Sequence, residues 1–139
     1  MTSRILLAED TAPIRDWIMK HLDKAGYSVT AVENGVAAFT LYQDTQRDPD
    51  IGNAVIPFDL VVTDGKMPGM PGWELIGKIR KYEVEHGGAV KGRTPVVILG
   101  ISSSPEYLKD LEKAGATSTL CKPFKKQELL LAVENCLRG

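Results

Sequence analysis

Several features that mark other classes of protein are scarce in this chain of 139 residues. Its two cysteines, Cys121 and Cys136, match no metal-binding spacing, which favours a reduced, cytoplasmic setting. No run of lysines and arginines occurs, and 17 basic residues nearly balance 18 acidic ones, so a nucleic-acid-binding surface is not indicated. No apolar segment approaches the length of a membrane span or of a signal peptide. We therefore expect a cytoplasmic protein that contacts neither nucleic acid nor membrane.

Internal repeats and low-complexity tails are also missing, and 43% hydrophobic residues suit one domain, 1–139, with its own core. Short apolar runs alternate five times with stretches of helical periodicity. The expected strands are 5–8, 27–32, 58–64, 95–101 and 117–121, and the expected helices are 12–25, 36–44, 73–84, 104–114 and 125–137. Two longer connections, 43–57 and 85–93, are expected to be surface loops. This alternation predicts one doubly wound α/β domain with a parallel sheet covered on both faces.

The expected helix ends carry capping residues. Thr11 is an expected N-cap for the first helix, with Pro13 in its first turn. For the fourth helix, either Ser103, which forms a capping box with Glu106, or Ser104 is the expected cap.

The segment 58–70 suggests where function lies. A short run rich in β-branched residues ends at Asp64, and two glycines and a proline follow within five residues. This pattern predicts a buried parallel strand with Asp64 at its carboxyl end, the edge at which open α/β sheets bind ligands. Glu9 and Asp10 end the first strand in the same way. If the two strands are neighbours, the three carboxylates form a cluster that a cation would neutralise, and oxygen-only ligands suit Mg²⁺.

Lys122 ends the fifth strand and adds a positive charge to the same edge. Carboxylates, a hard cation and a lysine are the groups that phosphoryl transfer requires, with Asp64 as the nucleophile. Simpler roles are open alternatives: Asp64 capping a turn, Asp10 capping the first helix and Lys122 as a solvated surface residue.

Three motifs occur in order along the chain: Glu9-Asp10, the segment 64–72 (DGKMPGMPG) and Lys122-Pro123-Phe124. Together they resemble the signature of bacterial two-component response-regulator receiver domains of the chemotaxis-regulator kind, over essentially the whole chain. The resemblance implies a flavodoxin-like fold with five helices and the strand order 2-1-3-4-5.

The resemblance also implies a function. Asp64 would accept a phosphoryl group from a sensor histidine kinase or phosphotransfer protein in a Mg²⁺-dependent reaction. Asp10 would bind Mg²⁺ directly, Glu9 would act through water and Lys66 would contribute its backbone carbonyl. The chain would be a cytoplasmic phosphoprotein of a phosphorelay that assists its own phosphorylation and dephosphorylation, and not an enzyme.

The family's output surface lies on the fourth helix, fifth strand and fifth helix, so a downstream protein is expected to bind there. The domain is expected to be a monomer or a weak dimer. On that surface the resemblance places Tyr107, Lys109, Lys113, Thr119 and Lys126.

The chain departs from the family pattern at Pro71, where receivers usually carry aspartate, at Ile101, where they usually carry alanine, and at two switch positions. Gly100 stands where receivers usually carry threonine or serine, and Thr119 stands where they usually carry an aromatic residue. Since the family's switch moves that hydroxyl and turns that ring, the conventional switch is in doubt while the phosphorylation chemistry is kept. Our hypothesis is that Ser102, which has the same facing as Gly100 in a strand, or its neighbour Ser103 takes over the phosphoryl contact.

Two alternatives follow from these departures and from the acids. One is a degenerate receiver that acts as a scaffold and binds its partner regardless of phosphorylation. The other is an aspartate-nucleophile phosphohydrolase, but such an enzyme needs a second aspartate two residues after the first, where this chain has Lys66.

Overall fold

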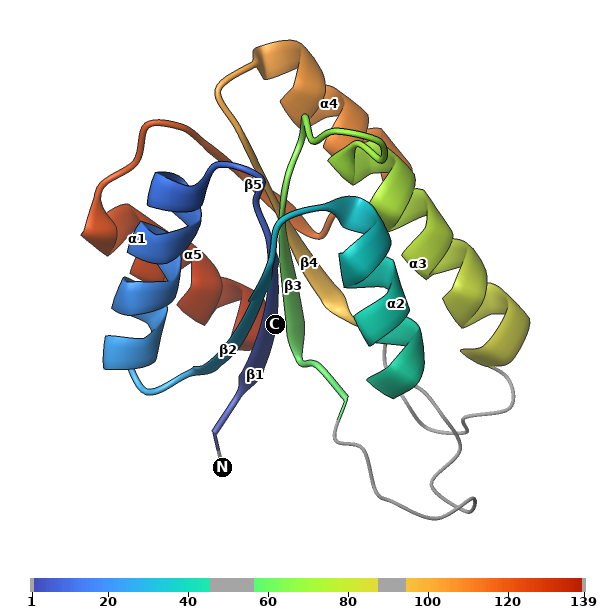
Figure 1. The fold of residues 1–139 in the computed structure, drawn as a ribbon, viewed down its shortest axis with the longest axis horizontal. Helices are drawn as coiled ribbons and strands as arrows, with labels where there is room; N and C mark the ends of the chain where they lie inside the picture. The colour runs from blue at the N-terminus through green and yellow to red at the C-terminus, as the bar shows by residue number, and fades with distance from the viewer. Residues whose placement is uncertain (1, 46–56, 88–94, 139) are drawn as a thin grey trace.

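The protein, described here from a computed structural model, is defined for residues 2–45, 57–87 and 95–138. Within these residues five strands alternate with five helices (Figure 1). The strands are β1 (Arg4–Ala8), β2 (Ser28–Val32), β3 (Leu60–Asp64), β4 (Val97–Ser102) and β5 (Ser118–Cys121). The helices are α1 (Ala12–Lys24), α2 (Gly35–Thr45), α3 (Gly72–Gly87), α4 (Pro105–Ala114) and α5 (Lys126–Arg138). All strands are parallel, in the order β2-β1-β3-β4-β5, which confirms the predicted doubly wound fold.

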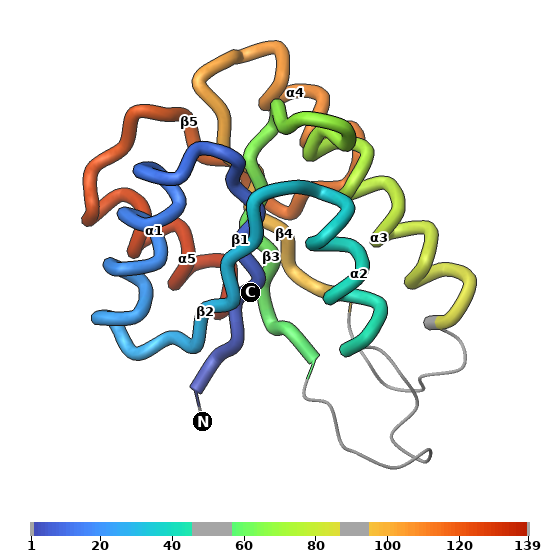
Figure 2. The backbone as a smooth tube through the Cα atoms, in the orientation of Figure 1, coloured from blue at the N-terminus to red at the C-terminus, as the bar shows by residue number. Residues whose placement is uncertain are grey.

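The two faces of the sheet are covered by different helices because successive side chains of a strand point to opposite sides. Leu6 and Val61 lie side by side and pack under α2, α3 and α4. Leu7 and Val62, one residue further on, pack under α1 and α5. Figures 1 and 2 show these two helical layers on either side of the sheet. All four side chains are fully buried, as expected for a central parallel sheet.

The helix ends agree with the predicted capping in part. Ser104 caps α4 by accepting a hydrogen bond from the Tyr107 backbone N–H at 3.3 Å, so the cap is Ser104 and not Ser103. Gly115 ends the same helix in the left-handed region, with φ of 120°. Thr11 stands at the N-cap position of α1 but its side chain makes no capping hydrogen bond.

Both predicted loops begin later than the sequence suggested. Helix α2 continues to Thr45, and α3 continues to Gly87, so the first residues of the segments 43–57 and 85–93 are helical. The remainder of each segment falls largely at 46–56 and 88–94, outside the described residues.

Arg80 ties α3 to the amino end of β4 and to the turn before β5. Its guanidinium donates to the carbonyl of Gly115 at 3.0 Å and to that of Val96 at 2.7 Å. It also pairs with Glu83 at 2.8 Å, and the second carboxylate oxygen of Glu83 accepts the Val96 N–H at 2.7 Å. These hydrogen bonds hold α3 to the amino ends of β4 and β5, at the edge of the sheet opposite to Asp64.

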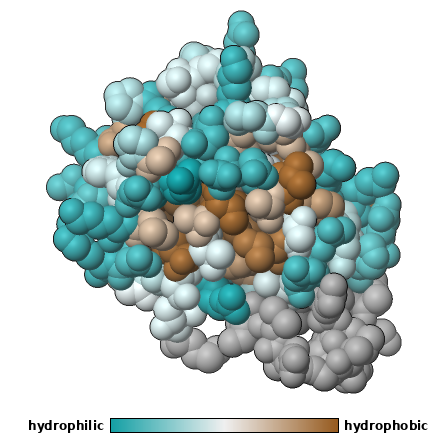
Figure 3. Space-filling view, viewed as in Figure 1, coloured by the Kyte–Doolittle hydropathy of each residue, from teal (hydrophilic) through white to brown (hydrophobic). Residues whose placement is uncertain are grey.

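Figure 3 shows apolar residues toward the middle of one face, in the region of β2 and α2, with hydrophilic residues around them. Val36 on α2 is the most exposed large apolar side chain in this region, at 58%. Among the described helices, none is both long and apolar enough to cross a bilayer.

Candidate functional site: an acidic cluster at the carboxyl edge of the sheet

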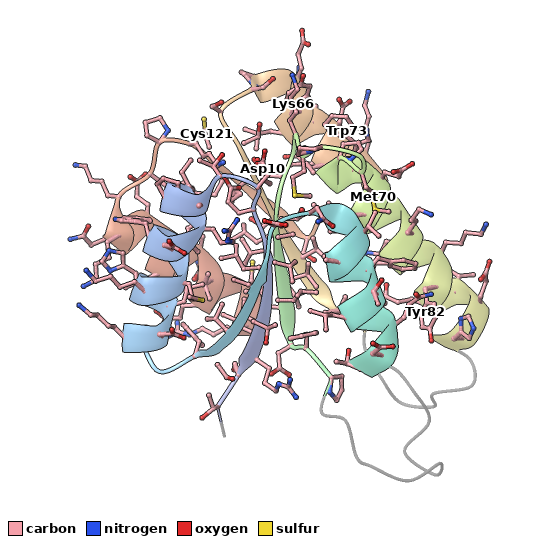
Figure 4. All side chains as sticks on the ribbon, viewed as in Figure 1. Asp10, Lys66, Met70, Trp73, Tyr82 and Cys121 are labelled. Carbon is pink, nitrogen blue, oxygen red and sulfur yellow. The ribbon has the colours of Figure 1, made fainter. Side chains whose placement is uncertain are left out.

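The pairing of β1 with β3 brings the three predicted acids together. Ala8 lies opposite Thr63, so Glu9 and Asp64 follow directly at adjacent strand ends. The Glu9 backbone is fixed on both sides, because its N–H donates to Val32 and its carbonyl accepts from the Arg15 guanidinium at 3.0 Å. In Figure 4, Asp10 and Lys66 lie at the edge where β1 and β3 end. The central strands thus place the acids on a rigid edge of the fold.

Carboxylate oxygens of Glu9, Asp10 and Asp64 all lie within 4.8 Å of one another. Glu9 and Asp64 are buried, whereas Asp10 is exposed. This confirms the clustering predicted from the strand ends. Three converging hard oxygen ligands with one open side are a donor set that fits Mg²⁺.

Lys122 supplies the counter-charge. Its Nζ donates to both carboxylate oxygens of Glu9, at 3.1 and 3.2 Å, and to Asp64 Oδ1 at 3.1 Å. The Lys122 backbone is held by its N–H, which donates to the Ser102 carbonyl at 2.9 Å, and a cis peptide bond joins it to Pro123. A surface position for Lys122 is therefore wrong, because its side chain is 16% exposed and is directed at the acids.

The electrostatics of the cluster favour an additional cation. Burial, with the nearby charge of Asp64, raises the pKa of Glu9 from 4.5 to about 7, although Lys122 opposes this shift. Burial also raises the pKa of Asp64, against the opposing effects of Lys122 and of the Gly65 N–H. One lysine thus compensates two buried carboxylates only partly. A divalent cation would stabilise their ionised forms.

The loop after Asp64 depends on two glycines. The Gly65 N–H donates to Asp64 Oδ1 at 2.9 Å, and the Gly65 carbonyl accepts from the Gly72 N–H at 2.7 Å. A Cβ on Gly72 would lie 2.1 Å from the Asp64 carbonyl oxygen, so no side chain fits there. Lys66 extends from this loop into solvent.

The structure shows why Gly100 has no side chain. A Cβ at this position would lie 2.8 Å from Leu111 Cδ1 and 3.1 Å from Leu111 Cβ, so Leu111 of α4 occupies the space. Thr119 is paired with Gly100 in the sheet, and its hydroxyl donates to Glu112 Oε1 at 3.2 Å. In place of a mobile hydroxyl and ring, these two positions therefore hold α4 against the sheet.

Ser102 lies near the loop of Asp64 but already has a local hydrogen bond. It is 4% exposed, and its Oγ accepts the Ser104 N–H at 3.1 Å. The same Oγ lies 3.4 Å from the point where a Gly65 Cβ would stand. Its contact with a phosphoryl group stays a prediction. Ser103, the neighbour that shared this hypothesis, is exposed.

Of the five residues on the predicted output surface, three are exposed and two are half-buried, and sequence reasoning missed the packing of one of the two, Tyr107. Lys109, Lys113 and Lys126 are exposed and Thr119 is half-buried. Tyr107 instead packs beside the loop of Asp64, with its Cβ 3.3 Å from the Cβ position of Gly65 and its ring centroid 5.1 Å from that of Trp73. A glycine inside a strand, as at Gly100, can indicate from sequence that another element packs closely there. No comparable sequence signal indicates that Tyr107 packs beside Gly65.

Comparison with known proteins agrees with this geometry. The profile of the family described as response regulator receiver domain matches residues 5–134. The chain is 31% identical, over 134 residues, to the response regulator receiver protein CpdR of Brucella abortus, covering 96% of each protein. It superimposes on the chemotaxis response regulator CheY4 of Vibrio cholerae with a TM-score of 0.77 and 26% identity, over 99% of this chain and 100% of that one.

A third neighbour shares the fold at lower identity. It is the receiver domain of a sensor histidine kinase from Pseudomonas aeruginosa, solved with a magnesium ion coordinated in its active-site cleft. Its TM-score is 0.75 and its identity 22%, with both chains fully covered. By contrast, the chain spans only 13% of the length of two rice relatives, each named probable histidine kinase 2, to which it is 26% identical.

Proposed function

This chain belongs to the response regulator receiver domain family, and from that premise we propose that it accepts a phosphoryl group on Asp64. The donor would be a sensor histidine kinase or a phosphotransfer protein, and the phosphorylated domain would change its contacts with a downstream protein in the cytoplasm. The observation that carries this proposal is the position of Lys122, whose Nζ contacts both Glu9 and Asp64 within 3.2 Å. An acid with a bound cationic partner at an open sheet edge is suited to phosphoryl transfer.

In the proposed step, a carboxylate oxygen of Asp64 forms a bond to phosphorus as the bond from phosphorus to the donor imidazole nitrogen breaks. The nitrogen keeps the electron pair and takes up a proton. Lys122 already lies against Asp64 Oδ1, so its ammonium can follow the negative charge onto the phosphoryl oxygens. The chain thereby assists its own phosphorylation and acts as a phosphoacceptor.

Asp10, Asp64 and the backbone carbonyl of Lys66 would hold Mg²⁺, with Glu9 acting through water. The three carboxylates fit this ion because their oxygens converge within 4.8 Å. When bound, Mg²⁺ supplies positive charge that neutralises the phosphoryl oxygens. The same charge would offset the burial that raises the pKa of Glu9 and Asp64.

Acetyl phosphate labelling tests the proposal. With Mg²⁺ present, the intact mass should rise by one phosphoryl group, and chelation of Mg²⁺ should prevent the rise. Asp64→Asn is the matched control because it keeps the shape of the side chain and removes the nucleophile. Equal labelling of wild type and Asp64→Asn, or no labelling of either, would contradict the proposal.

A second candidate function is a receiver that binds its partner regardless of phosphorylation. The observation that favours it is the contact of Leu111 with Gly100, which leaves no room for the usual switch hydroxyl. Hydrogen exchange with and without beryllofluoride, an analogue of the phosphoryl group, separates the two. Unchanged exchange in α4, β5 and α5 of protein that has bound beryllofluoride would favour the scaffold.

A further inference from the structure

The two usual switch positions are engaged in packing α4, so any effect of Asp64 on this helix must use other contacts. Leu111 covers Gly100, and the Thr119 hydroxyl donates to Glu112 at 3.2 Å. Both contacts are in the body of α4. The first turn of the helix, by contrast, contacts the Asp64 loop itself.

That contact is made by Tyr107 over Gly65. Gly65 has no side chain, and Tyr107 Cβ lies 3.3 Å from the point where a Gly65 Cβ would stand. Tyr107 therefore lies directly beside Gly65, and a larger residue at that position would crowd it. The Gly65 N–H in turn donates both to Asp64 Oδ1 and to the Ile101 carbonyl of β4, each at 2.9 Å. A single residue therefore separates the Asp64 carboxylate from Tyr107.

Two chains of hydrogen bonds hold this arrangement. On the α4 side, Ser104 accepts the Tyr107 N–H, and the Ser104 N–H donates to Ser102 Oγ at 3.1 Å. On the α3 side, the Gly72 N–H donates to the Gly65 carbonyl at 2.7 Å, and Trp73 follows directly. The Trp73 and Tyr107 rings then meet with centroids 5.1 Å apart and planes tilted by 38°.

We propose that Tyr107 is a positioning residue of the Asp64 site, which couples the state of Asp64 to the first turns of α3 and α4. This inference rests on the proposed phosphorylation of Asp64. A phosphoryl group on the carboxylate changes the charge that Asp64 presents to the Gly65 N–H, whose other acceptor is the Ile101 carbonyl. The position of Gly65 between these two acceptors is therefore expected to change. Tyr107 and Trp73 lie against that loop and move with it. Trp73 of α3 and Tyr107 of α4 would thus carry the structural response that the usual hydroxyl and ring carry at the positions of Gly100 and Thr119.

Fluorine NMR of protein labelled with 5-fluorotryptophan tests this inference. The chain contains only two tryptophans, and Trp17→Phe assigns their resonances. Trp73 reports on the proposed contact. Trp17 reports on the other side of the sheet, because it packs with Phe124 against the core cluster under α1 and α5. On adding Mg²⁺ and beryllofluoride, the Trp73 resonance should shift, with the shift lost in Tyr107→Ala and kept in Tyr107→Phe.

Bound beryllofluoride gives its own fluorine resonances, so binding and coupling are measured in one spectrum. Bound beryllofluoride with an unmoved Trp73 resonance would overturn the inference and leave the proposed function standing. A Trp73 shift that persists in Tyr107→Ala would also overturn it, because the effect would then pass through Gly72 alone. Absence of bound beryllofluoride together with no acetyl phosphate labelling would remove the proposed function and the inference with it. Tyr107→Leu gives the same test if Tyr107→Ala fails to fold.

Discussion

Substitution of Gly100 by alanine is expected to destabilise the protein, although glycine-to-alanine substitutions at unstrained positions often stabilise proteins. Gly100 lies in β4 with Thr63 and Thr119 opposite it on the neighbouring strands. The added Cβ would meet Leu111 Cδ1 at 2.8 Å and Leu111 Cβ at 3.1 Å. Because Leu111 is fully buried, its Cδ1 has little room to rotate away, and its Cβ is bound to the backbone of α4, so both the side chain and the helix have to shift.

Two opposing contributions decide whether Gly100→Ala raises or lowers the free energy of unfolding. Replacing glycine by alanine at a permissive position stabilises by about 0.4–1 kcal/mol, because the unfolded chain loses conformational freedom. Overpacking a buried site costs about 1–3 kcal/mol. Since Leu111 is fully buried and cannot turn toward solvent, we expect overpacking to dominate, with a net loss of about 1–2 kcal/mol. For a domain of this size that corresponds to a fall of about 3–8 °C in Tm.

Urea denaturation of Gly100→Ala and Gly77→Ala is the assay. Gly77 lies on the exposed side of α3 with nothing within 4 Å of its Cβ position, so alanine there should stabilise by up to about 1 kcal/mol. The double variant Gly100→Ala/Leu111→Ala removes the 2.8 Å contact and should show a coupling energy of about 1 kcal/mol or more. A Gly100→Ala protein as stable as wild type, or strictly additive single changes, would refute the packing account.

Three further predictions concern the acidic site and the Arg80 hydrogen bonds at the opposite end of the sheet. Burial raises the pKa of Glu9 to about 7, and Mg²⁺ binding requires the ionised carboxylate. The Mg²⁺ affinity measured by titration should therefore decrease as the pH is lowered from about 8 to about 6. The affinity of Glu9→Gln should depend less on pH. Arg80→Ala should lose about 1–3 kcal/mol in urea denaturation, because it leaves partly buried carbonyl acceptors unpaired. Lys81→Ala, which breaks only an exposed ion pair, should lose about 0.5 kcal/mol or less. Gly72→Ala should abolish acetyl phosphate labelling, and labelling at the wild-type rate would contradict the 2.1 Å clash with the Asp64 carbonyl.

Much of the fold could be predicted because its determinants are local in the sequence. Apolar runs of strand length alternate with helical periodicity, and that alternation allows few arrangements other than a parallel sheet between two helical layers. The acidic cluster followed from the same logic, since Glu9 and Asp64 end strands whose carboxyl ends share one edge. Details at helix ends were less predictable: α2 and α3 continue past the expected ends, and Ser104 rather than Ser103 is the cap.

The sequence by itself therefore determined the order of the elements, the edge that carries the acids and the departure from the family pattern at Gly100. Only the tertiary structure decided what fills the space at Gly100, and what lies against Gly65. Leu111 and Tyr107 reach those glycines because of the angle and height at which α4 packs on the sheet. That placement results from the summed packing of many side chains distant in sequence, so no local pattern records it.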